Sequence, residues 1–362
     1  MVTSPIGCYI KVLRRKIIIL MWYIKLAHLN IFPDWLLRLA VRISLYAGWI
    51  KKHRTPFDER EHHRQTLIRR LKASPIAIET DQPNIQHYEV PSDFFRLVLG
   101  RWMKYSCCFW SENVHTLDAA EAAMLALTCE RAQIADGMHI LDLGCGWGAF
   151  SMWAAQHYPH ARIMALSNSR TQKAFIDSQC RQYDIRNIET ITADVANLDL
   201  RGAFDRVVSI EMFEHMKNYQ HLLSKIAALF KKDGKLFVHI FSNIDHAHEF
   251  DASDPNSWMA QTFFTGGLMP SDDLLLHFQN DLSLEAHWRM NGLHYTKTLN
   301  AWLERMYRHK QQILPILADV YGRDRTTAWW VNWKLFFLGC AETWRMRGGA
   351  EYLVSHYLFQ KR

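Results

Sequence analysis

Short apolar runs alternate with stretches of helical periodicity through the middle of the chain. The apolar runs have five or six residues, and the segments between them repeat their apolar positions every three to four residues. The runs cover 139–143, 162–166, 188–192, 206–210 and 236–241, and a sixth lies near the C-terminus at about 352–359. Strands that alternate with helices in this way are typical of α/β proteins. We therefore predict an α/β fold with a mostly parallel sheet flanked by helices.

The N-terminal part of the chain has helical periodicity and no such strands. Between residues 16 and 52 apolar side chains recur at steps of three and four, and Pro33 is placed to open a helix. Residues 53–71 predict a mixed-charge helix that faces solvent. Helices of this kind either pack on the main domain or lie at a membrane surface with Trp22 and Trp35 at the headgroup level. We favour packing, because most amphipathic helices in globular proteins face a core.

Charge is distributed unevenly along the 362 residues. The chain has 43 Lys and Arg against 36 Asp and Glu, and its net charge is +7. Residues 1–72 have a net charge of +11, whereas residues 73–362 have a net charge of −4. A basic surface over the whole fold is thereby excluded, so we expect no nucleic-acid partner. The basic N-terminal surface could face anionic lipid, RNA or only water.

Cysteine usage and the N-terminal apolar run both favour the cytoplasm. The seven cysteines are odd in number and no two have C-x-x-C spacing, so we expect neither a metal site nor a disulfide framework. The most apolar run, 17–24, has eight residues, whereas a helix that spans a membrane needs about 20. No small-x-small cleavage site follows it, and we interpret it as a helix of the mature protein. Peripheral contact with a membrane stays possible.

Three glycines at alternate positions between 144 and 148 follow the first predicted strand. Asp142 lies just ahead of them, and a helix is predicted at 151–157. In an α/β sheet such a loop lies at the carboxyl end of the first strand, where ligands bind. Glycine is needed there because a Cβ would keep the backbone away from the ligand or clash within the turn.

Two cofactors compete for this loop. A dinucleotide would need an acidic residue at the end of the second strand to bond a ribose, but residues 167–169 read Ser-Asn-Ser. S-adenosylmethionine fits better, because Asp142 would lie near its amino-acid end and no pyrophosphate is present to be repelled. Asp194, at the end of the third strand, is well placed to accept a hydrogen bond from the adenine amino group. We therefore predict S-adenosylmethionine as the cofactor.

Two carboxylates and a histidine follow the fourth predicted strand. If a helix begins there, Glu211, Glu214 and His215 are spaced i, i+3 and i+4 and share one face, towards the methyl group of the cofactor. Acidic residues favour helix N-termini for electrostatic reasons alone. That explains neither the histidine nor the apolar Met212 and Phe213. We therefore predict an acid–base cluster.

Longer motifs resemble the cyclopropane-fatty-acyl-phospholipid synthase superfamily. Within it, the chain is more similar to the coclaurine N-methyltransferases and their relatives that act on benzylisoquinoline alkaloids. The resemblance runs from about Phe32 to Arg362 and includes the motifs at 104–107, 130–138, 141–148, 167–169, 210–219, 237–241, 263–271, 291–298 and 355–362. It implies a class I S-adenosylmethionine-dependent methyltransferase with a Rossmann-like core.

The resemblance also implies roles for the matched positions. Tyr105 and Ser106 would lie over the methionine carboxylate, and Asn168 and Gln172 would hold the ribose. The full set of implied cofactor contacts is Tyr105, Ser106, Asp142, Gly144, Gly146, Asn168, Gln172, Asp194, Val195 and Ile210. The predicted acid–base cluster corresponds to that of the N-methyltransferases. A base is needed because an alkyl amine is mostly protonated at pH 7, whereas methyl transfer needs a free lone pair on nitrogen.

The lipid-modifying relatives suggest a different acceptor. In cyclopropane synthases a bound bicarbonate is the base, and its contacts match Cys107, Glu214, His239 and Tyr295, all retained in type. A further contact falls on Phe241, where the synthases have a small aliphatic residue. Glu211 stands where phospholipid synthases often have glycine, although mycolic-acid relatives carry Glu. A bulky ring and an extra carboxylate disfavour bicarbonate and an acyl chain, and they suit a cationic amine.

Four segments and one leading function follow. We predict a basic helical segment at 1–95, a cofactor-binding core at 96–245, an aromatic-rich helical lid at 246–350 and a final strand at 351–362. The predicted function is methyl transfer from S-adenosylmethionine to the nitrogen of a small aromatic amine. The alternatives are methylation of unsaturated phospholipid acyl chains and cofactor binding without catalysis. Peripheral membrane contact and a homodimer are further expectations.

Overall fold

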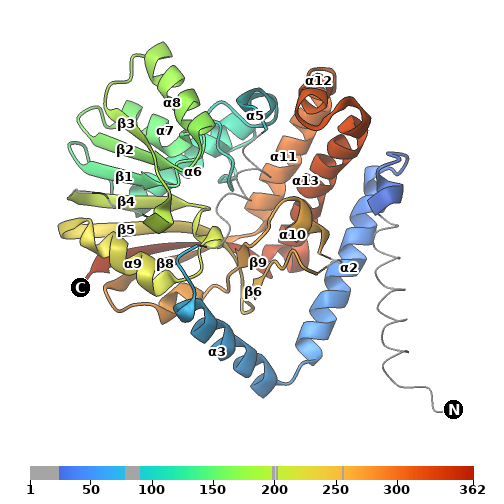
Figure 1. The fold of residues 1–362 in the computed structure, drawn as a ribbon, viewed down its shortest axis with the longest axis horizontal. Coiled ribbons are helices and arrows are strands. Elements are labelled where there is room, and N and C mark those ends of the chain that lie inside the picture. Colours follow the sequence, from blue (N-terminus) through green and yellow to red (C-terminus); the bar gives the residue numbers. More distant parts are fainter. Residues whose placement is uncertain (1–23, 78–89, 198–199, 201–202, 255–256) are drawn as a thin grey trace.

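A seven-stranded sheet forms the centre of the protein in a computed structural model, which describes residues 24–77, 90–197, 200, 203–254 and 257–362 (Figure 1). Its strands are β1 (His139–Leu143), β2 (Arg162–Ser167), β3 (Ile188–Thr192), β4 (Phe204–Ile210), β5 (Phe230–Asn243), β8 (Leu282–Asn291) and β9 (Tyr352–Lys361). Their order in the sheet is β3-β2-β1-β4-β5-β9-β8. Strands β1 to β5 are parallel, and β9 runs antiparallel to both β5 and β8. The predicted α/β fold with a mostly parallel sheet is confirmed.

Every apolar run that predicted a strand lies within one. The runs become the parallel strands β1 to β5 and the antiparallel β9. Most of their apolar side chains are buried between layers of helices, although the edge strand β3 is only partly buried. Three strands among the described residues were missed. The segment 246–350 was expected to be a helical lid, yet it contributes β8 to the central sheet as well as a small separate sheet of β6 (His248–Glu249) and β7 (Leu268–Met269). The division into four segments otherwise stays a prediction.

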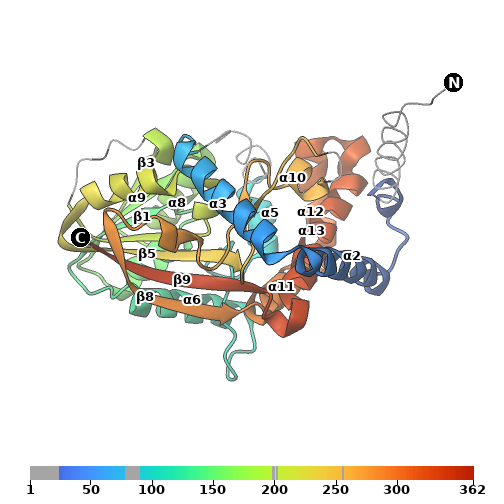
Figure 2. The same ribbon diagram turned by 90° about the horizontal axis from the view of Figure 1, so that it is seen from below.

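Helices cover both faces of the sheet and extend past its carboxyl edge (Figures 1 and 2). They are α2 (Asp34–Arg54), α3 (Phe57–Ala73), α5 (Ser92–Val98), α6 (Leu117–Arg131), α7 (Ala149–His157), α8 (Arg170–Gln182), α9 (Tyr219–Ala228), α10 (Trp258–Thr262), α11 (Leu293–Arg308), α12 (Lys310–Tyr321) and α13 (Thr326–Gly349). Short 3₁₀ turns are η2 (Val195–Asn197), η3 (Phe213–His215), η4 (Leu274–His277) and η5 (Arg323–Arg325). Apolar side chains of α6 and α7 pack on one face, and those of α9 and the end of α3 pack on the other.

The order of the strands reverses between β1 and β4. From β1 the chain moves outwards to β2 and β3, and it then returns to the other side of β1 with β4 and β5. The loops that follow β1 and β4 therefore separate at the carboxyl edge of the sheet. Ligands of open α/β sheets bind in the crevice that forms at such a reversal. Residues 144–148 and 211–215 lie in these two loops.

The two N-terminal helices differ in how they meet the rest of the chain. Pro56 precedes α3, so the helix predicted at 53–71 begins at Phe57. Most of it faces solvent as predicted, but Leu67, Ile68 and Leu71 near its end are buried. Helix α2 begins after Pro33, as predicted, and lies beside α13 (Figures 1 and 2). The predicted helix at 17–24 falls almost entirely outside the described residues.

A buried carboxylate holds α2 against α13. Arg38 Nη1 donates to Glu342 Oε1 at 2.8 Å, and Arg42 Nε donates to Glu342 Oε2 at 2.5 Å. The Glu342 side chain is only 1% exposed, whereas the two arginines reach solvent. These two guanidinium groups lower the pKa of Glu342 against the opposing effect of burial. Part of the N-terminal positive charge therefore serves to hold α2 against α13.

We expect Glu342→Ala to lower the free energy of unfolding by about 1.5–3 kcal/mol, the range for hydrogen bonds to charged groups. Chemical denaturation measures this change, and limited proteolysis reports whether α2 is released. Glu304→Ala is the matched control, because the Arg308–Glu304 pair on α11 is mostly exposed and should contribute less than about 1 kcal/mol. Equal effects of the two substitutions would contradict this account.

Among the described helices, none combines the length and the apolar character that a crossing of the bilayer requires.

Candidate active site

The loop after β1 has the backbone geometry that its glycines predict. Gly144, Gly146 and Gly148 all have positive φ, at 83°, 53° and 81°. Side chains rarely adopt such angles, which explains glycine at alternate positions. The amide N–H groups of Gly144 and Cys145 donate to Leu166 O at 3.0 and 2.9 Å, so β2 fixes the loop. A Cβ at Gly146 would meet no protein atom within 4 Å, so this side of the loop faces open space.

A cavity of about 60 Å³ lies against this loop. Seven of the predicted cofactor residues line it, namely Tyr105, Ser106, Asp142, Gly144, Gly146, Gln172 and Ile210. Gln172 has an unused donor, because its Oε1 accepts from Ser167 Oγ at 2.6 Å while its buried Nε2 has no hydrogen-bond partner among the described residues. The glycine cradle, the buried donor and the acidic side chain fit the ribose and the amino-acid part of S-adenosylmethionine. We call this space the cofactor cavity.

The remaining three predicted cofactor residues lie outside the lining of the cofactor cavity. Asn168 is exposed after β2. Asp194 and Val195 follow β3 at the same carboxyl edge, and Asp194 Oδ1 accepts from the amide of Ala196 at 2.8 Å. Their predicted contacts with ribose and adenine stay predictions.

Asp142 is buried at the end of β1 beside the cofactor cavity. Its Oδ2 accepts a hydrogen bond from Ser151 Oγ at 2.6 Å, and its side chain has no charged partner among its described contacts. Burial raises the pKa of Asp142 to about 7, although the hydrogen bond from Ser151 opposes the shift. A cationic group in the cavity would favour the ionised carboxylate.

Glu211 does not begin a helix. Its φ is +47°, and it is followed by the 3₁₀ turn η3, so the prediction that Glu211, Glu214 and His215 share one helical face is wrong. A left-handed backbone costs about 1–2 kcal/mol for a residue with a Cβ. The amide of Glu211 donates to His239 O at 2.8 Å, which holds the bend to β5. Such strain is found where a side chain must be aimed into a site.

Three donors surround the carboxylate of Glu211. Oε1 accepts from the amide of Cys107 at 2.9 Å and lies 3.2 Å from His239 Nε2. Oε2 accepts from the hydroxyl of Tyr295 at 2.5 Å. Burial raises the pKa of Glu211, while the nearby Lys104 and these hydrogen bonds oppose the shift. Cys107 and Tyr295 donate, and His239 also donates in its Nε2–H tautomer, so these contacts favour the ionised carboxylate.

Glu214 and His215 have different surroundings. Glu214 is fully buried behind the cavities, where its Oε1 accepts from the amide of Phe241 at 3.1 Å. Burial and the neighbouring Glu211 charge raise the pKa of Glu214 well above its usual range, which favours its neutral form. His215 reaches the substrate side, and burial lowers its pKa to about 4, so its imidazole is also neutral. Of the two carboxyl groups, Glu211 is the one with charged and hydrogen-bonding neighbours that favour its ionised form, because Lys104 and the donors of Cys107 and Tyr295 oppose the effect of burial.

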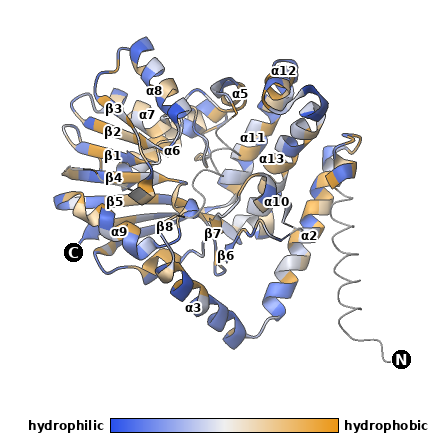
Figure 3. Ribbon diagram, viewed as in Figure 1, coloured by the Kyte–Doolittle hydropathy of each residue, from blue (hydrophilic) through white to orange (hydrophobic). Residues whose placement is uncertain are grey.

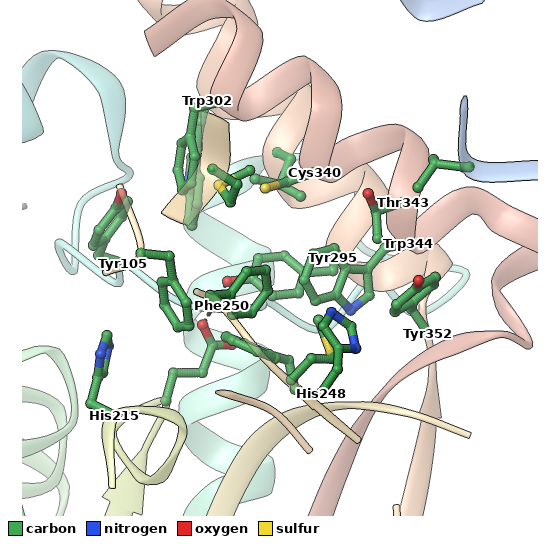
Figure 4. A pocket seen from close by; sticks show the side chains of 18 residues that line it. Tyr105, His215, His248, Phe250, Tyr295, Trp302, Cys340, Thr343, Trp344 and Tyr352 are labelled. Atoms are coloured by element: carbon green, nitrogen blue, oxygen red, sulfur yellow. Dashed lines mark hydrogen bonds between the residues drawn. The ribbon is translucent and has the colours of Figure 1, made fainter. Parts of the chain in front are cut away.

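A second cavity, of about 290 Å³, is lined by Glu211 and by residues of β5, α11 and α13 (Figure 4). We call it the aromatic cavity, because nine of its lining residues are aromatic, namely Tyr105, Phe241, Phe250, Phe264, Tyr295, Trp302, Phe336, Trp344 and Tyr352. In Figure 4, Tyr105 and His215 lie at one end, and Thr343 and Tyr352 lie at the other. Glu211 is the only acidic side chain among the described residues that line it, and these include no Lys or Arg.

The two cavities share two residues. Tyr105 and Glu211 line both the cofactor cavity and the aromatic cavity. A group bound in one cavity would therefore meet a group bound in the other beside the Glu211 carboxylate. Helix α2 also contributes Leu45 to the aromatic cavity, a role that its sequence did not suggest.

The sequence analysis also missed two charged residues that order the loop before α6. Glu121, on α6, accepts from the amides of Gly100 and Trp102 at 2.9 and 2.8 Å and is completely buried. Lys104 Nζ donates to Cys107 O at 2.7 Å and to Ser106 Oγ at 2.5 Å. These contacts place Tyr105 to Cys107 at the cavities. The sequence contains one indication of this role, because the acidic Glu121 stands among the apolar positions of 117–131.

S-adenosylmethionine-dependent methyltransferases bind their charged cofactor at the strand reversal and the methyl acceptor in a neighbouring cavity. The chain is an enzyme of this class. A family model described as mycolic acid cyclopropane synthetase matches residues 78–350, so the chain belongs to that family.

Individual relatives agree with this assignment. The chain is 36% identical over 343 residues to (S)-coclaurine N-methyltransferase of Thalictrum flavum subsp. glaucum, covering 94% of this chain and 95% of the relative. It is 29% identical over 267 residues to the cyclopropane-fatty-acyl-phospholipid synthase of Escherichia coli (strain K12), covering 72% of this chain and 64% of that protein. A crystal structure of coclaurine N-methyltransferase bound to N-methylheliamine and SAH has a TM-score of 0.88 at 33% identity, covering 96% and 100% of the two chains.

These comparisons confirm the predicted family, class I fold, enzyme class and cofactor. They also agree with the predicted transfer of the methyl group to nitrogen.

Proposed function

We propose that the enzyme methylates the nitrogen of a small aromatic amine. The observation that carries this proposal is the position of Glu211. Among the described residues it is the one acidic side chain that lines the aromatic cavity, and it also borders the cofactor cavity. A cation is attracted both by a carboxylate and by the faces of aromatic rings. The aromatic cavity therefore suits a ligand that combines a flat apolar body with an ammonium group.

Glu211 would act on the ammonium in two ways. It would orient the nitrogen towards the cofactor cavity by accepting an N–H, and it would take the proton so that the nitrogen lone pair becomes free. Burial in the aromatic cavity lowers the pKa of the amine, which eases this transfer. S-adenosylmethionine supplies the electrophilic methyl group when bound. The remaining rate gain would come from holding nitrogen and methyl carbon in line in a cavity with few water molecules.

The roles of Glu214 and His215 in the proposed site follow from their charge states. Glu214 accepts from the amide of Phe241 and so supports the bend, and its raised pKa opposes a second negative charge beside Glu211. Neutral His215 could accept an N–H of the amine, but its pKa of about 4 makes it a weak proton acceptor. We therefore propose Glu211 as the base and His215 as an orienting group.

The contacts of Glu211 also support an amine over a lipid acceptor. Of the positions that would contact bicarbonate by resemblance, Cys107, His239 and Tyr295 all lie within hydrogen-bond distance of Glu211 oxygens. A trigonal carboxylate of the protein thus uses the donors that would otherwise bind a trigonal ion. The ring of Phe241 packs against Trp344 with centroids 5.5 Å apart and fills the adjoining space.

A substrate series tests the proposal. The purified enzyme is given S-adenosylmethionine together with a bicyclic aromatic secondary amine, the matching cyclic ether with oxygen in place of N–H, or vesicles of an unsaturated phospholipid. We expect methylation of the amine alone, with the same rate in bicarbonate-depleted buffer. Methylation of the acyl chains in place of the amine would refute the proposal.

Asp142 provides a pH-dependent test of the proposed cofactor site. We propose that the ionised carboxylate binds the cofactor's ammonium group, and its pKa is about 7 in the free protein. Protonation below this pKa opposes binding, so the affinity for S-adenosylhomocysteine should fall by up to about tenfold per pH unit below about pH 7. Isothermal titration calorimetry measures this slope.

Asp142→Asn should weaken binding at about pH 8 and remove that part of the slope, because an amide does not titrate in this range. An unchanged slope in this variant would assign the titration to another group.

We also propose that α2 contacts a membrane surface peripherally. Its exposed apolar side chains fall on one helical face, namely Trp35, Leu39, Ile43, Tyr46 and Ile50, and Figure 3 shows hydrophobic positions along the helix. Lys51 and Arg54 near its end add positive charge. The protein should co-sediment with vesicles that contain phosphatidylserine, and Ile43→Glu should weaken this binding. If the protein instead forms a dimer that Ile43→Glu dissociates, and does not bind vesicles, the exposed face of α2 contacts a second copy of the chain.

A further inference from the structure

A row of hydrogen-bonded side chains leads from the carboxylate of Glu211 into the interior. His239 Nε2 lies 3.2 Å from Glu211 Oε1, and His239 Nδ1 lies 2.8 Å from His356 Nε2. His356 Nδ1 lies 2.8 Å from Arg131 Nη1. Both histidines are completely buried. The row therefore joins Arg131, at the end of α6, to the proposed base.

The sheet fixes the spacing of this row. His239 on β5 and His356 on β9 are direct partners in the antiparallel register, and Trp288 on β8 is the next partner of His356. The guanidinium of Arg131 stacks over the Trp288 ring at 5.0 Å, which holds it at the outer end of the row. Strands β5 and β9 thus place the two histidines side by side, with Glu211 after β4 at one end of the row and Arg131 on α6 at the other.

Arg131 determines the direction of every hydrogen bond in the row. A guanidinium has donors and no acceptor, so His356 Nδ1 must accept from it. The proton of neutral His356 is then on Nε2 and is donated to His239 Nδ1. The proton of neutral His239 is accordingly also on Nε2 and is donated to Glu211 Oε1. Burial and the nearby cations lower the pKa of both histidines well below its usual range, which keeps them neutral.

We propose that Arg131, acting through His356 and His239, is a positioning residue that fixes Glu211 Oε1 as a hydrogen-bond acceptor and directs proton uptake to Glu211 Oε2. This inference deepens the proposed function and rests on it for the role of Glu211. In the proton transfer, the N–H bond of the ammonium breaks, its electron pair stays on nitrogen, and the proton binds to Oε2. The row cannot carry that proton away, because each of its members already donates towards Glu211. The proton therefore leaves through the aromatic cavity.

Other groups also face Glu211 and contribute to its titration. Besides His239, they are Lys104, Cys107, Glu214, His215, Tyr295 and Cys340. Lys104 and the donors favour the ionised form, whereas burial opposes it. Loss of one donor should therefore shift the titration of Glu211 to higher pH without removing it.

The tautomers provide a test that needs no substrate. The ¹⁵N spectra of histidine-labelled protein, with His239 and His356 assigned from His239→Asn and His356→Gln, should show both rings as neutral Nε2–H tautomers between about pH 6 and about pH 8. A wild-type protein with the Nδ1–H tautomer or a protonated ring at either position would overturn the proposal. This result is independent of whether an amine is methylated.

Activity provides the second readout. In Arg131→Met the tautomer of His356 is no longer fixed, so we expect mixed tautomers and an acid limb of kcat/KM that moves to higher pH by about 0.5–1 unit. Arg131→Lys keeps a cationic donor and should restore much of both properties. KM for S-adenosylmethionine should stay unchanged in both variants.

Arg206→Met is the matched control for Arg131→Met. Arg206 is buried whereas Arg131 is half-buried, and Arg206 Nε donates to Ala132 O at 2.8 Å at the same end of α6. Its hydrogen bonds among the described residues go to backbone carbonyls outside the row. This control should lower stability without moving the acid limb or the tautomers. Unchanged tautomers and an unchanged limb in Arg131→Met, or an equal limb shift in Arg206→Met, would overturn the proposal.

Discussion

Glu211→Gln should lower kcat for amine methylation by about 10²–10⁴-fold, the usual contribution of a general base. The amide can neither take a proton from an ammonium nor accept equally from Cys107, His239 and Tyr295, which all donate to the native carboxylate. The affinity for S-adenosylhomocysteine should change by less than about threefold, because the substitution removes an interaction that acts in the reaction and not in cofactor binding. Steady-state kinetics and calorimetry measure the two effects.

Glu211→Gly provides a sharper form of this test. The φ of +47° at this position favours glycine, so the variant should fold at least as stably as the Gln variant. It also removes the carboxylate that accepts from Cys107, His239 and Tyr295. Added formate, which is a free carboxylate, should bind to these donors and restore part of the activity. Formate should not rescue Glu211→Gln, where the side chain still fills the space. Full activity of either variant without formate would show that Glu211 is not the base.

Gly146→Ala should weaken binding of S-adenosylhomocysteine by about 10–100-fold, the equivalent of 1–3 kcal/mol of overpacking. The new Cβ would meet no protein atom within 4 Å, so the protein can accommodate it. It would instead extend into the space that we propose for the cofactor. Calorimetry with S-adenosylhomocysteine measures the loss, and circular dichroism checks the fold.

Gly137→Ala is the matched control for this substitution. Gly137 also has a positive φ, of 81°, and open space at its Cβ position, but it does not line the cofactor cavity. Both variants should lose a similar amount of stability, because both place a Cβ on a left-handed backbone. Equal cofactor affinity in the two variants would contradict the proposed position of the cofactor.

The elements that could be predicted are those that a short stretch of sequence determines. Strands β1, β2 and β4 and the second half of β5 are mostly buried apolar runs, and the glycine loop has the positive φ angles that its sequence requires. β8 was missed because 282–291 has only two buried residues, at Leu282 and Met290, and is otherwise a partly exposed edge strand. Its sequence therefore lacks the continuous apolar signal of the parallel strands.

The geometry of the active site depends on contacts between distant segments. Spacing along the chain placed Glu211, Glu214 and His215 on one helical face, yet the amide of Glu211 bonds to His239 O and the chain bends there. Nothing local in the sequence links Arg131 and His356 to Glu211, because their alignment follows from the register of β5 and β9. The chemistry of the site was thus visible in the residue types, whereas their charge states required the fold.

The most direct test of the central claim is the fate of a labelled methyl group when both acceptors compete. The enzyme is incubated with S-adenosylmethionine that carries a trideuterated methyl group, an aromatic secondary amine and unsaturated phospholipid vesicles, and the products are separated by mass spectrometry. The account predicts that the complete CD₃ group is found on the amine nitrogen, with all three deuterons retained. Deuterium in the acyl chains, with no labelled amine, would contradict it.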